Sequence, residues 1–221
     1  MPMPVRRGSW LPVRVLCVAV AAVVAAGCVQ PPGLPEAGPT TRAKAHSETA
    51  RQNASAIRRL GGAVDYGQVD PDTGQRSGIS ATITPAMVKA ADRHQLGSVA
   101  ASALRPPGLD RLPARNRARG HLLGRQLGGS GDLEENLVAL YQSRANTPVM
   151  RDYETAVAQA VQAGQTVRYR VRPVYPSRRF DGAPSAIRLT ANGDRGFRLD
   201  VTIANTPDAA VTETIAPPAS R

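Results

Sequence analysis

The residue with the most chemically informative neighbours is His121, which lies in the segment RARGHLLG at residues 117–124. Arginines stand two and four positions before it, at Arg119 and Arg117. Because nearby positive charge disfavours the imidazolium form, we expect the pKa of His121 to be lowered. A neutral imidazole at pH 7 can accept a proton, so the segment indicates a general base beside anion-binding groups.

Oxygen-bearing side chains follow His121 along the chain. Asn136 and Asn146 carry amide oxygens, and Glu154 carries a carboxylate. Oxygen ligands without a thiolate favour Mg²⁺ over Zn²⁺. A histidine base, oxygen ligands and several arginines together predict metal-assisted cleavage of a phosphodiester bond.

Each of these features taken alone also fits a structural role. Asparagines cap helices or form turns, and a glutamate can be a solvated helix residue. Residues 128–131 (GGSG) look like a phosphate loop but lack its lysine and its strand-to-helix setting, which favours a turn. Arg168, Arg170 and Arg172 alternate with apolar residues, so they also fit an exposed sheet face.

The order of several motifs resembles the DNA/RNA non-specific endonuclease family, in particular its bacterial branch that includes nuclease toxins of type VII secretion systems. The resemblance covers roughly residues 60 to 205. The matching segments are RGHLLG (119–124), QLGGSG (126–131), ENLV (135–138), NTPVMRDYE (146–154), GQTVRY (164–169), PVY (173–175) and GFRLDV (196–201).

The resemblance implies a ββα-metal core and a role for each matching residue. His121 matches the general base of the family's Asp-Arg-Gly-His motif, and Arg119 matches the motif arginine. Asn146 matches the asparagine that ligates a single Mg²⁺, and Glu154 matches an acid that holds metal-bound water. Asn136 matches an asparagine that supports the site, so we group it with the catalytic residues.

The chain departs from the family motif at one position. The residue that is usually Asp is Ala118 here, and its loss is expected to weaken Mg²⁺ binding or lower activity. Asn116 is close enough in sequence to be considered as a substitute.

The mechanism that follows from the resemblance is hydrolysis of DNA and RNA with Mg²⁺, for which Mn²⁺ is a substitute, leaving 5′-phosphates. Residues 101–180 hold 13 arginines against six acids, a balance that suits binding of nucleic-acid backbones without base reading. We expect Arg117, Arg125 and Arg144 to contact substrate phosphates. The sequence identifies no inhibitor or immunity partner.

Hydrophobic periodicity predicts an α+β domain with an antiparallel sheet. Residues 78–84, 166–175, 185–191 and 197–203 alternate as strands, the last two around a turn at 192–194. A helix is expected from about Pro148 to Gly164.

The N-terminus has the pattern of an export signal. Two arginines precede an apolar stretch, residues 13–26, that is too short for an ordinary membrane span. Small residues then lead to Cys28, as in a bacterial lipobox, although Ala25 stands where leucine is usual. We therefore expect a lipoprotein-type signal peptide at 1–27, a membrane anchor through lipidated Cys28, and a protein on the extracellular face of the membrane or secreted.

The remaining boundaries follow from composition. Residues 28–54 are predicted to be a disordered tether, 55–206 the nuclease domain and 207–221 a flexible tail. The hydrophobic content of 42% suffices for a core. Aromatic residues, at 4%, are too scarce for a base-stacking platform.

Two alternatives to an active nuclease remain open from the sequence. A catalytically silent nucleic-acid-binding surface lipoprotein would keep the fold and the arginines, and Ala118 is its main support. A structural envelope lipoprotein would use the net charge of +11 to contact anionic wall polymers or lipids.

Overall fold

The computed structural model describes residues 39–101 and 103–213, with side chains from residue 48 onward. The predicted signal peptide at 1–27 and the predicted lipidation at Cys28 lie outside these residues. Within the part of the chain that is described, no helix combines the length and the apolar character needed to cross a membrane.

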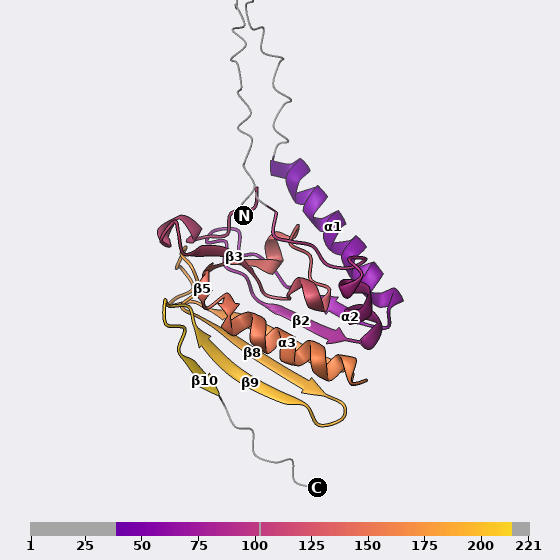
Figure 1. The fold of residues 1–221 in the computed structure, drawn as a ribbon. Helices are drawn as coiled ribbons and strands as arrows, with labels where there is room; N and C mark the ends of the chain where they lie inside the picture. The colour runs from indigo at the N-terminus through magenta and orange to yellow at the C-terminus, as the bar shows by residue number, and fades with distance from the viewer. Residues whose placement is uncertain (1–38, 102, 214–221) are drawn as a thin grey trace, which may run out of the picture. The chain divides into compact units, whose positions relative to one another are not determined.

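A six-stranded sheet forms one layer, and every pairing between neighbouring strands in it is antiparallel (Figure 1). Its strands in spatial order are β1 (Ala63–Asp65), β2 (Ile79–Ile83), β7 (Val167–Val174), β8 (Ala186–Gly193), β9 (Arg198–Ala204) and β10 (Val211–Glu213). The predicted α+β class with an antiparallel sheet is therefore confirmed. Strands β8 and β9 form the predicted hairpin, but its turn lies at residues 194–197, because Asn192 and Gly193 belong to β8 and Asn192 pairs with Arg198.

A second layer carries the segments with the candidate site residues. Strands β3 (Arg117–His121) and β4 (Leu137–Tyr141) form an antiparallel pair, and helix α3 (Val149–Gln162) follows. Two short strands, β5 (Ser143–Arg144) and β6 (Thr147–Pro148), pair in the turn between β4 and α3. The helix ends before Gly164, whose φ of +91° suits glycine after a helix.

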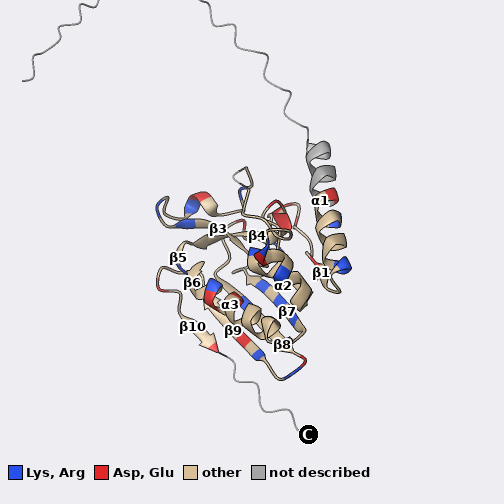
Figure 2. Ribbon diagram, turned by 45° about the vertical axis from the view of Figure 1, so that its right-hand side comes forward, with Lys and Arg blue, Asp and Glu red and all other residues tan. Residues whose placement is uncertain are grey.

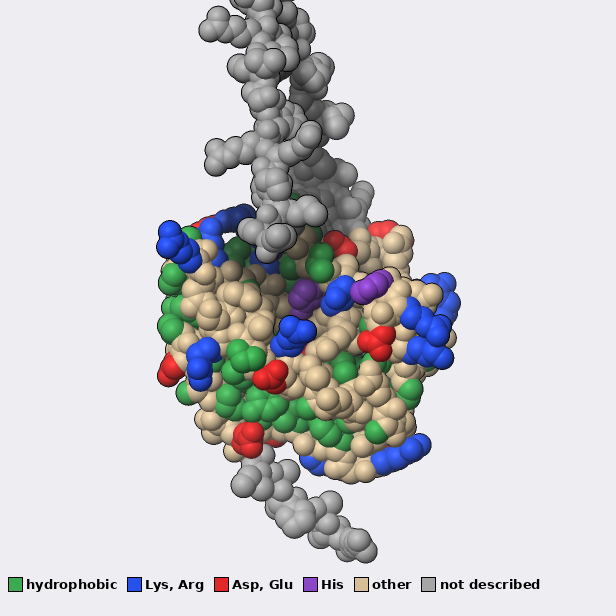
Figure 3. Space-filling view, in the orientation of Figure 1, with side chains coloured by type: hydrophobic (Ala, Val, Ile, Leu, Met, Phe, Trp, Pro, Cys, Tyr) green, Lys and Arg blue, Asp and Glu red, His purple; other side chains and the backbone are tan. Residues whose placement is uncertain are grey.

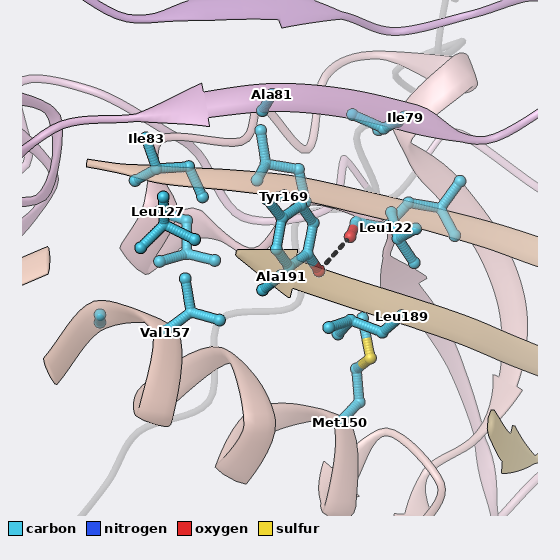
Figure 4. Packing of buried hydrophobic residues seen from close by; sticks show 14 of the residues in the cluster. Ile79, Ala81, Ile83, Leu122, Leu127, Met150, Val157, Tyr169, Leu189 and Ala191 are labelled. Atoms are coloured by element: carbon cyan, nitrogen blue, oxygen red, sulfur yellow. Dashed lines mark hydrogen bonds between the residues drawn. The ribbon is translucent and has the colours of Figure 1, made fainter. Parts of the chain in front are cut away.

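The core lies between the sheet and α3 (Figure 4). Alternation along β7 turns Val167, Tyr169 and Val171 inward and the arginines between them outward. The Tyr169 hydroxyl donates a hydrogen bond of 2.9 Å to the Leu122 carbonyl oxygen, which joins the sheet to the residue after His121. Burying the phenol is acceptable because its hydroxyl has this partner.

Short helices complete the fold. Helix α2 (Pro85–Asp92) begins after Thr84, whose hydroxyl caps the Met87 N–H, and Pro85 occupies the first turn. The 3₁₀ helices are η1 (Leu109–Arg111), η2 (Arg125–Leu127) and η3 (Glu134–Asn136).

Helix α1 (Pro39–Arg59) differs from the tether predicted for residues 28–54. The segment is rich in residues with high helix propensity, and Glu48 pairs with Arg51 at helical spacing. Among its described side chains, Asn53 and buried Ile57 contact the domain. The prediction of a tether is therefore wrong from Pro39 onward.

The tail predicted for residues 207–221 is also wrong in part. Residues Val211–Glu213 form β10, which pairs with β9 at the sheet edge. Glu213 also accepts a hydrogen bond of 3.1 Å from the Tyr153 hydroxyl. Two β-branched residues at a free edge are sufficient for one more short strand.

Candidate active site

Two cavities share His121 and Asn146 as lining residues. The larger, of about 440 Å³, extends along β3 past Arg117, Ala118 and Arg119. The smaller, of about 340 Å³, extends towards α3 and is lined by Glu154. The β3–β4 hairpin and α3 thus bring together three groups that are up to 33 positions apart in sequence. In Figure 3 the described histidine side chains lie on one face, with a Lys or Arg side chain between them.

His121 ends β3 and is held through its ring. Its Nε2 lies 3.1 Å from the Ser98 carbonyl oxygen. A carbonyl oxygen only accepts hydrogen bonds, so Nε2 carries the proton and Nδ1 has the free lone pair. This tautomer is the one that a general base needs, because the second ring nitrogen is held in place by the protein.

The pKa of His121 is lowered, as the sequence predicted, but for a different principal reason. Burial of the ring has the largest effect, and the nearby Arg125 charge acts in the same direction. The Ser98 carbonyl and Asp132 partly offset them. Arg117 and Arg119, the cause expected from the sequence, lie near His121 along the chain but are not among the causes of the shift in the fold.

Asn146 presents an amide oxygen at the same place. Its backbone N–H donates to the Tyr141 carbonyl (2.9 Å), and its side-chain Nδ2 donates to Gln142 Oε1 (3.1 Å). This bond to Nδ2 leaves Oδ1 as the free donor atom for a cation. A Cβ at position 120 would lie 3.1 Å from Oδ1, so Gly120 allows β3 to pass close to the amide.

Glu154 is buried in α3, with 7% of its surface exposed. No described residue forms a hydrogen bond with its Oε1. Burial raises the pKa of Glu154 to about 8, and the Gly124 backbone and the Gln126 side chain act in the opposite direction. A Cβ at position 124 would lie 2.5 Å from Glu154 Cδ, so only glycine leaves room for this carboxyl group. A buried oxygen without a partner is costly unless something not in the chain satisfies it.

These groups fit a hard divalent cation. The amide oxygen of Asn146 and the carboxyl group of Glu154 face one cavity, and oxygen ligands are those that Mg²⁺ prefers. Among the described residues there is no cluster of three or more His, Cys, Asp and Glu side chains that could hold a metal. Such a site leaves most ligand positions to water and substrate phosphate, which is typical of Mg²⁺.

Asn136 lies beside the site but does not face it. It is fully buried, and its side chain forms three hydrogen bonds to backbone groups. Its Oδ1 accepts from Leu123 N (2.8 Å), and its Nδ2 donates to the carbonyls of Leu123 (3.0 Å) and Ser130 (2.8 Å). These bonds hold the loop that follows His121, so Asn136 is a positioning residue and not a catalytic one.

The predicted arginines fall into two groups. Arg117 and Arg119 line the larger cavity and Arg125 the smaller one. Arg119 Nε is buried, and no described residue accepts a hydrogen bond from it. Arg144 is exposed, donates from Nε to the Asp208 carbonyl oxygen (3.0 Å) and lines neither cavity. The fold therefore does not bring Arg144 to the site.

The structure also corrects the suggestion that Asn116 replaces the missing acid. Its Oδ1 accepts from Ser143 N (2.6 Å), and it lines neither cavity. Ala118 itself lines the larger cavity, so the position of the missing carboxylate is adjacent to the site.

Three residues of the site were not predicted from the sequence: Ser98, Gln142 and Arg151. The Ser98 carbonyl has no signal in the sequence because any residue can supply it. Gln142 orients Asn146 from within the same turn, and no pattern marked it. Arg151 lines the smaller cavity one helical turn before Glu154, and this i, i+3 spacing was a signal that could have found it.

A pair of antiparallel strands with a histidine at the end of one, followed by a helix whose glutamate lines the same cavity, is the arrangement of the ββα-metal nuclease core. The sequence model of the DNA/RNA non-specific endonuclease family matches residues 54–194. The chain belongs to this family, as its motifs predicted, and is an endonuclease that hydrolyses nucleic acids.

Solved structures with the same fold include NucA from Streptococcus agalactiae with a magnesium ion bound. It is 20% identical, with a TM-score of 0.53, over 69% of this chain and 80% of that chain. The Sda1 nuclease with a bound zinc ion is also 20% identical, with a TM-score of 0.51, over 65% of this chain and 74% of that one. No curated protein matched the chain.

Proposed function

We propose that this endonuclease is exported, depends on Mg²⁺ and cleaves both DNA and RNA, with His121 as general base. The observation that carries the proposal is the hydrogen bond from His121 Nε2 to the Ser98 carbonyl. This hydrogen bond leaves Nδ1 free. His121 and Asn146 line both cavities, and Glu154 lines the smaller one. The magnesium named for the similar NucA structure supports the choice of metal.

In the proposed mechanism, His121 Nδ1 takes a proton from the water that attacks phosphorus. The attack breaks the bond to the 3′-oxygen and leaves a 5′-phosphate. Asn146 and Glu154 would hold Mg²⁺, and Mn²⁺ would serve in its place. The metal, when bound, supplies charge neutralisation at the scissile phosphate.

Arg119, Arg117 and Arg125 would hold phosphate oxygens from the two sides of His121. Arg117 is already oriented by its bond to Asp110 (2.8 Å). Guanidinium groups that grip phosphates read no bases and do not depend on a 2′-hydroxyl, which supports activity on both DNA and RNA.

The test uses supercoiled plasmid and a structured RNA with the purified protein. We expect both to be degraded in Mg²⁺ and to stay intact with excess EDTA. His121→Ala is expected to lower the rate by about 10²–10⁴-fold, the range for loss of a general base. Lys89→Gln is the control, because Lys89 is exposed on α2 and lines neither active-site cavity. Wild-type cleavage by His121→Ala, or by the EDTA-treated protein, would contradict the mechanism.

The proposal of export rests on the sequence of residues 1–28. In a bacterial host, a lipidated protein would partition into detergent, incorporate labelled fatty acid and lose both properties in Cys28→Ser. Release of an unlabelled wild-type protein into the medium would instead mean simple secretion.

A further inference from the structure

The outer face of the large sheet carries a set of arginines that the proposed active site does not use. We call it the outer arginine face: Arg168, Arg170 and Arg172 of β7 and Arg188 of β8, all exposed. Arg172 lies opposite Arg188 in the β7–β8 pairing. Figure 2 marks the Lys and Arg positions along these strands in blue.

This face is the reverse of the layer that holds His121. Successive side chains along a strand point to opposite faces, and Tyr169 points inward to the Leu122 carbonyl beside His121. Its neighbours Arg168 and Arg170 therefore point away from the active site. None of the four arginines lines either active-site cavity.

Two adjoining hollows lie on the outer arginine face. The larger, of about 530 Å³, is lined by Arg168 and Arg170, and the smaller, of about 230 Å³, by Arg170, Arg172 and Arg188. Arg170 and Thr190 line both, so the hollows are continuous across β7 and β8. The other polar side chains of the larger hollow are the hydroxyl and amide groups of Ser80, Thr82, Thr190 and Asn192 and the carboxylate of Asp65.

The four arginines of this face outnumber the two acids beside them, Asp65 in the larger hollow and Asp200 of β9. Arg188 pairs with Asp200 at 3.1 Å, and Arg170 Nε donates to the Ser80 hydroxyl at 3.3 Å. Within residues 48–101 and 103–213, no ion pair or side-chain hydrogen bond is formed by Arg168 or Arg172. Residues two apart on a strand are about 6.6 Å apart, so β7 holds three like charges in a row. Binding of a polymer of anions with a similar repeat would offset the repulsion between these three charges.

We propose that the outer arginine face binds the phosphate backbone of a second segment of the polynucleotide being cleaved. Guanidinium groups suit phosphate oxygens, and the intervening hydroxyl and amide groups can donate to phosphate and sugar. An anionic membrane fits less well, because the large apolar side chains exposed in the described part of the chain, Val99, Val174 and Val211, line neither hollow.

A second site changes how a long substrate is held. While one segment occupies the active site, another stays bound on the reverse face. The polymer is therefore held near the active site at a high effective concentration, which favours a new cleavage. The benefit is confined to polymers long enough to pass around the sheet edge. The identity of the ligand as a polynucleotide rests on the proposed function, but the outer arginine face is separate from the catalytic groups.

Binding is tested with the triple variant Arg168→Gln, Arg170→Gln, Arg172→Gln in excess EDTA. Three exposed arginines elsewhere, Arg58, Arg59 and Arg93, are changed to glutamine as the matched control. We expect the affinity for a labelled 40-nucleotide single strand at low salt to fall at least about tenfold only in the first variant. Its salt slope should fall by about 2, since each lost contact removes about 0.7. Equal affinities and slopes in both variants would overturn the proposal.

The second test compares the cleavage kinetics of these variants and their binding to anionic vesicles. On plasmid, the triple variant should raise KM about tenfold with kcat unchanged, whereas cleavage of a six-nucleotide substrate should stay within twofold of wild type. A variant that loses binding to anionic vesicles but keeps polynucleotide binding would overturn the proposal in favour of a lipid surface. A wild-type protein that binds the 40-mer but cuts nothing in Mg²⁺ would contradict the proposed nuclease function, and the binding comparison would still decide the second site.

Discussion

His121 Nε2 lies 3.1 Å from the backbone carbonyl oxygen of Ser98, which comes 23 residues earlier in the chain. The carbonyl is held in turn by the loop that follows His121. The Ser98 hydroxyl donates to Asp132 Oδ2 (2.7 Å) and accepts from Gly131 N (2.8 Å), and Ser98 N donates to Gly129 O (3.1 Å). The orientation of the proposed base therefore depends on a backbone carbonyl oxygen that residues 129–132 hold in place.

This geometry predicts the protonation state of His121. At pH 7 in metal-free protein, side-chain ¹⁵N spectra should show a neutral ring with the proton on Nε2. Because burial lowers the pKa of His121, its titration should fall below the ordinary value of 6.5. The ring signals are assigned to His121 by their absence from the spectrum of His121→Ala. A ring with the proton on Nδ1, or one charged at pH 7, would contradict the proposed role.

Asn136→Ala should destabilise the fold and lower activity together. The substitution leaves three backbone groups of Leu123 and Ser130 buried without a partner, each costing about 1–3 kcal/mol, so we expect a loss of about 3 kcal/mol or more. Urea unfolding measures it. The control is Asn116→Ala, which removes one hydrogen bond from an exposed turn and should cost about 1 kcal/mol. Equal losses in the two variants would show that Asn136 does not hold the loop.

The sheet and α3 were predictable because their residues follow strong local rules. The strict alternation of residues 166–175 and the apolar spacing of the helix after Pro148 reflect burial on one face only. Strand β3 carried no such pattern, because its residues Arg117 to Arg119 are all half-buried along a cavity. Only the resemblance to the nuclease family implied the ββα arrangement.

The site residues were predictable by motif, but their environments were not. His121, Asn146 and Glu154 line one cavity, whereas Arg144, next but one to Asn146 in sequence, is bonded to Asp208 in another segment. The pKa of His121 depends on burial and on Arg125, which only the folded chain determines. Such contacts join segments far apart in sequence, and no single-sequence pattern encodes them.

Gly124→Ala should displace the Glu154 carboxyl group with little backbone strain. The φ of −63° and ψ of 153° at Gly124 are accessible to alanine, and the three atoms nearest to the added Cβ all belong to the Glu154 carboxyl group. We expect metal affinity and activity to fall about 10–100-fold, the range for disturbed support of a metal site. Metal affinity is measured by calorimetry without substrate. In the double variant Gly124→Ala, Glu154→Ala, stability should recover while activity does not. Wild-type metal affinity in Gly124→Ala would show that the carboxyl group is not needed there.

Glu154→Gln should change how stability depends on pH in EDTA. The folded carboxyl group has a pKa of about 8, above the ordinary value of 4.5, so folding favours the protonated form. Its contribution to stability is complete below pH 4.5 and is lost as the pH rises to about 8. Wild type should therefore lose up to about 5 kcal/mol relative to Glu154→Gln over this range. Urea unfolding of both proteins from pH 5 to 9 measures the difference. Parallel curves would contradict burial of the carboxyl group.

Ala118→Asp should tighten Mg²⁺ binding, because it adds a carboxylate to the larger cavity beside His121 and Asn146. Ala118 is half-buried in β3, and Arg117 and Arg119, which line the same cavity, would compensate the new charge. We expect the Mg²⁺ concentration for half-maximal cleavage to fall several-fold, and the pKa of His121 to rise because an anion favours the imidazolium. Ala118→Asn has the same size without the charge and should leave the pKa of His121 unchanged. If Ala118→Asp leaves both quantities at their wild-type values, the charge at position 118 does not reach the metal site, and the chain has lost nothing by carrying alanine there.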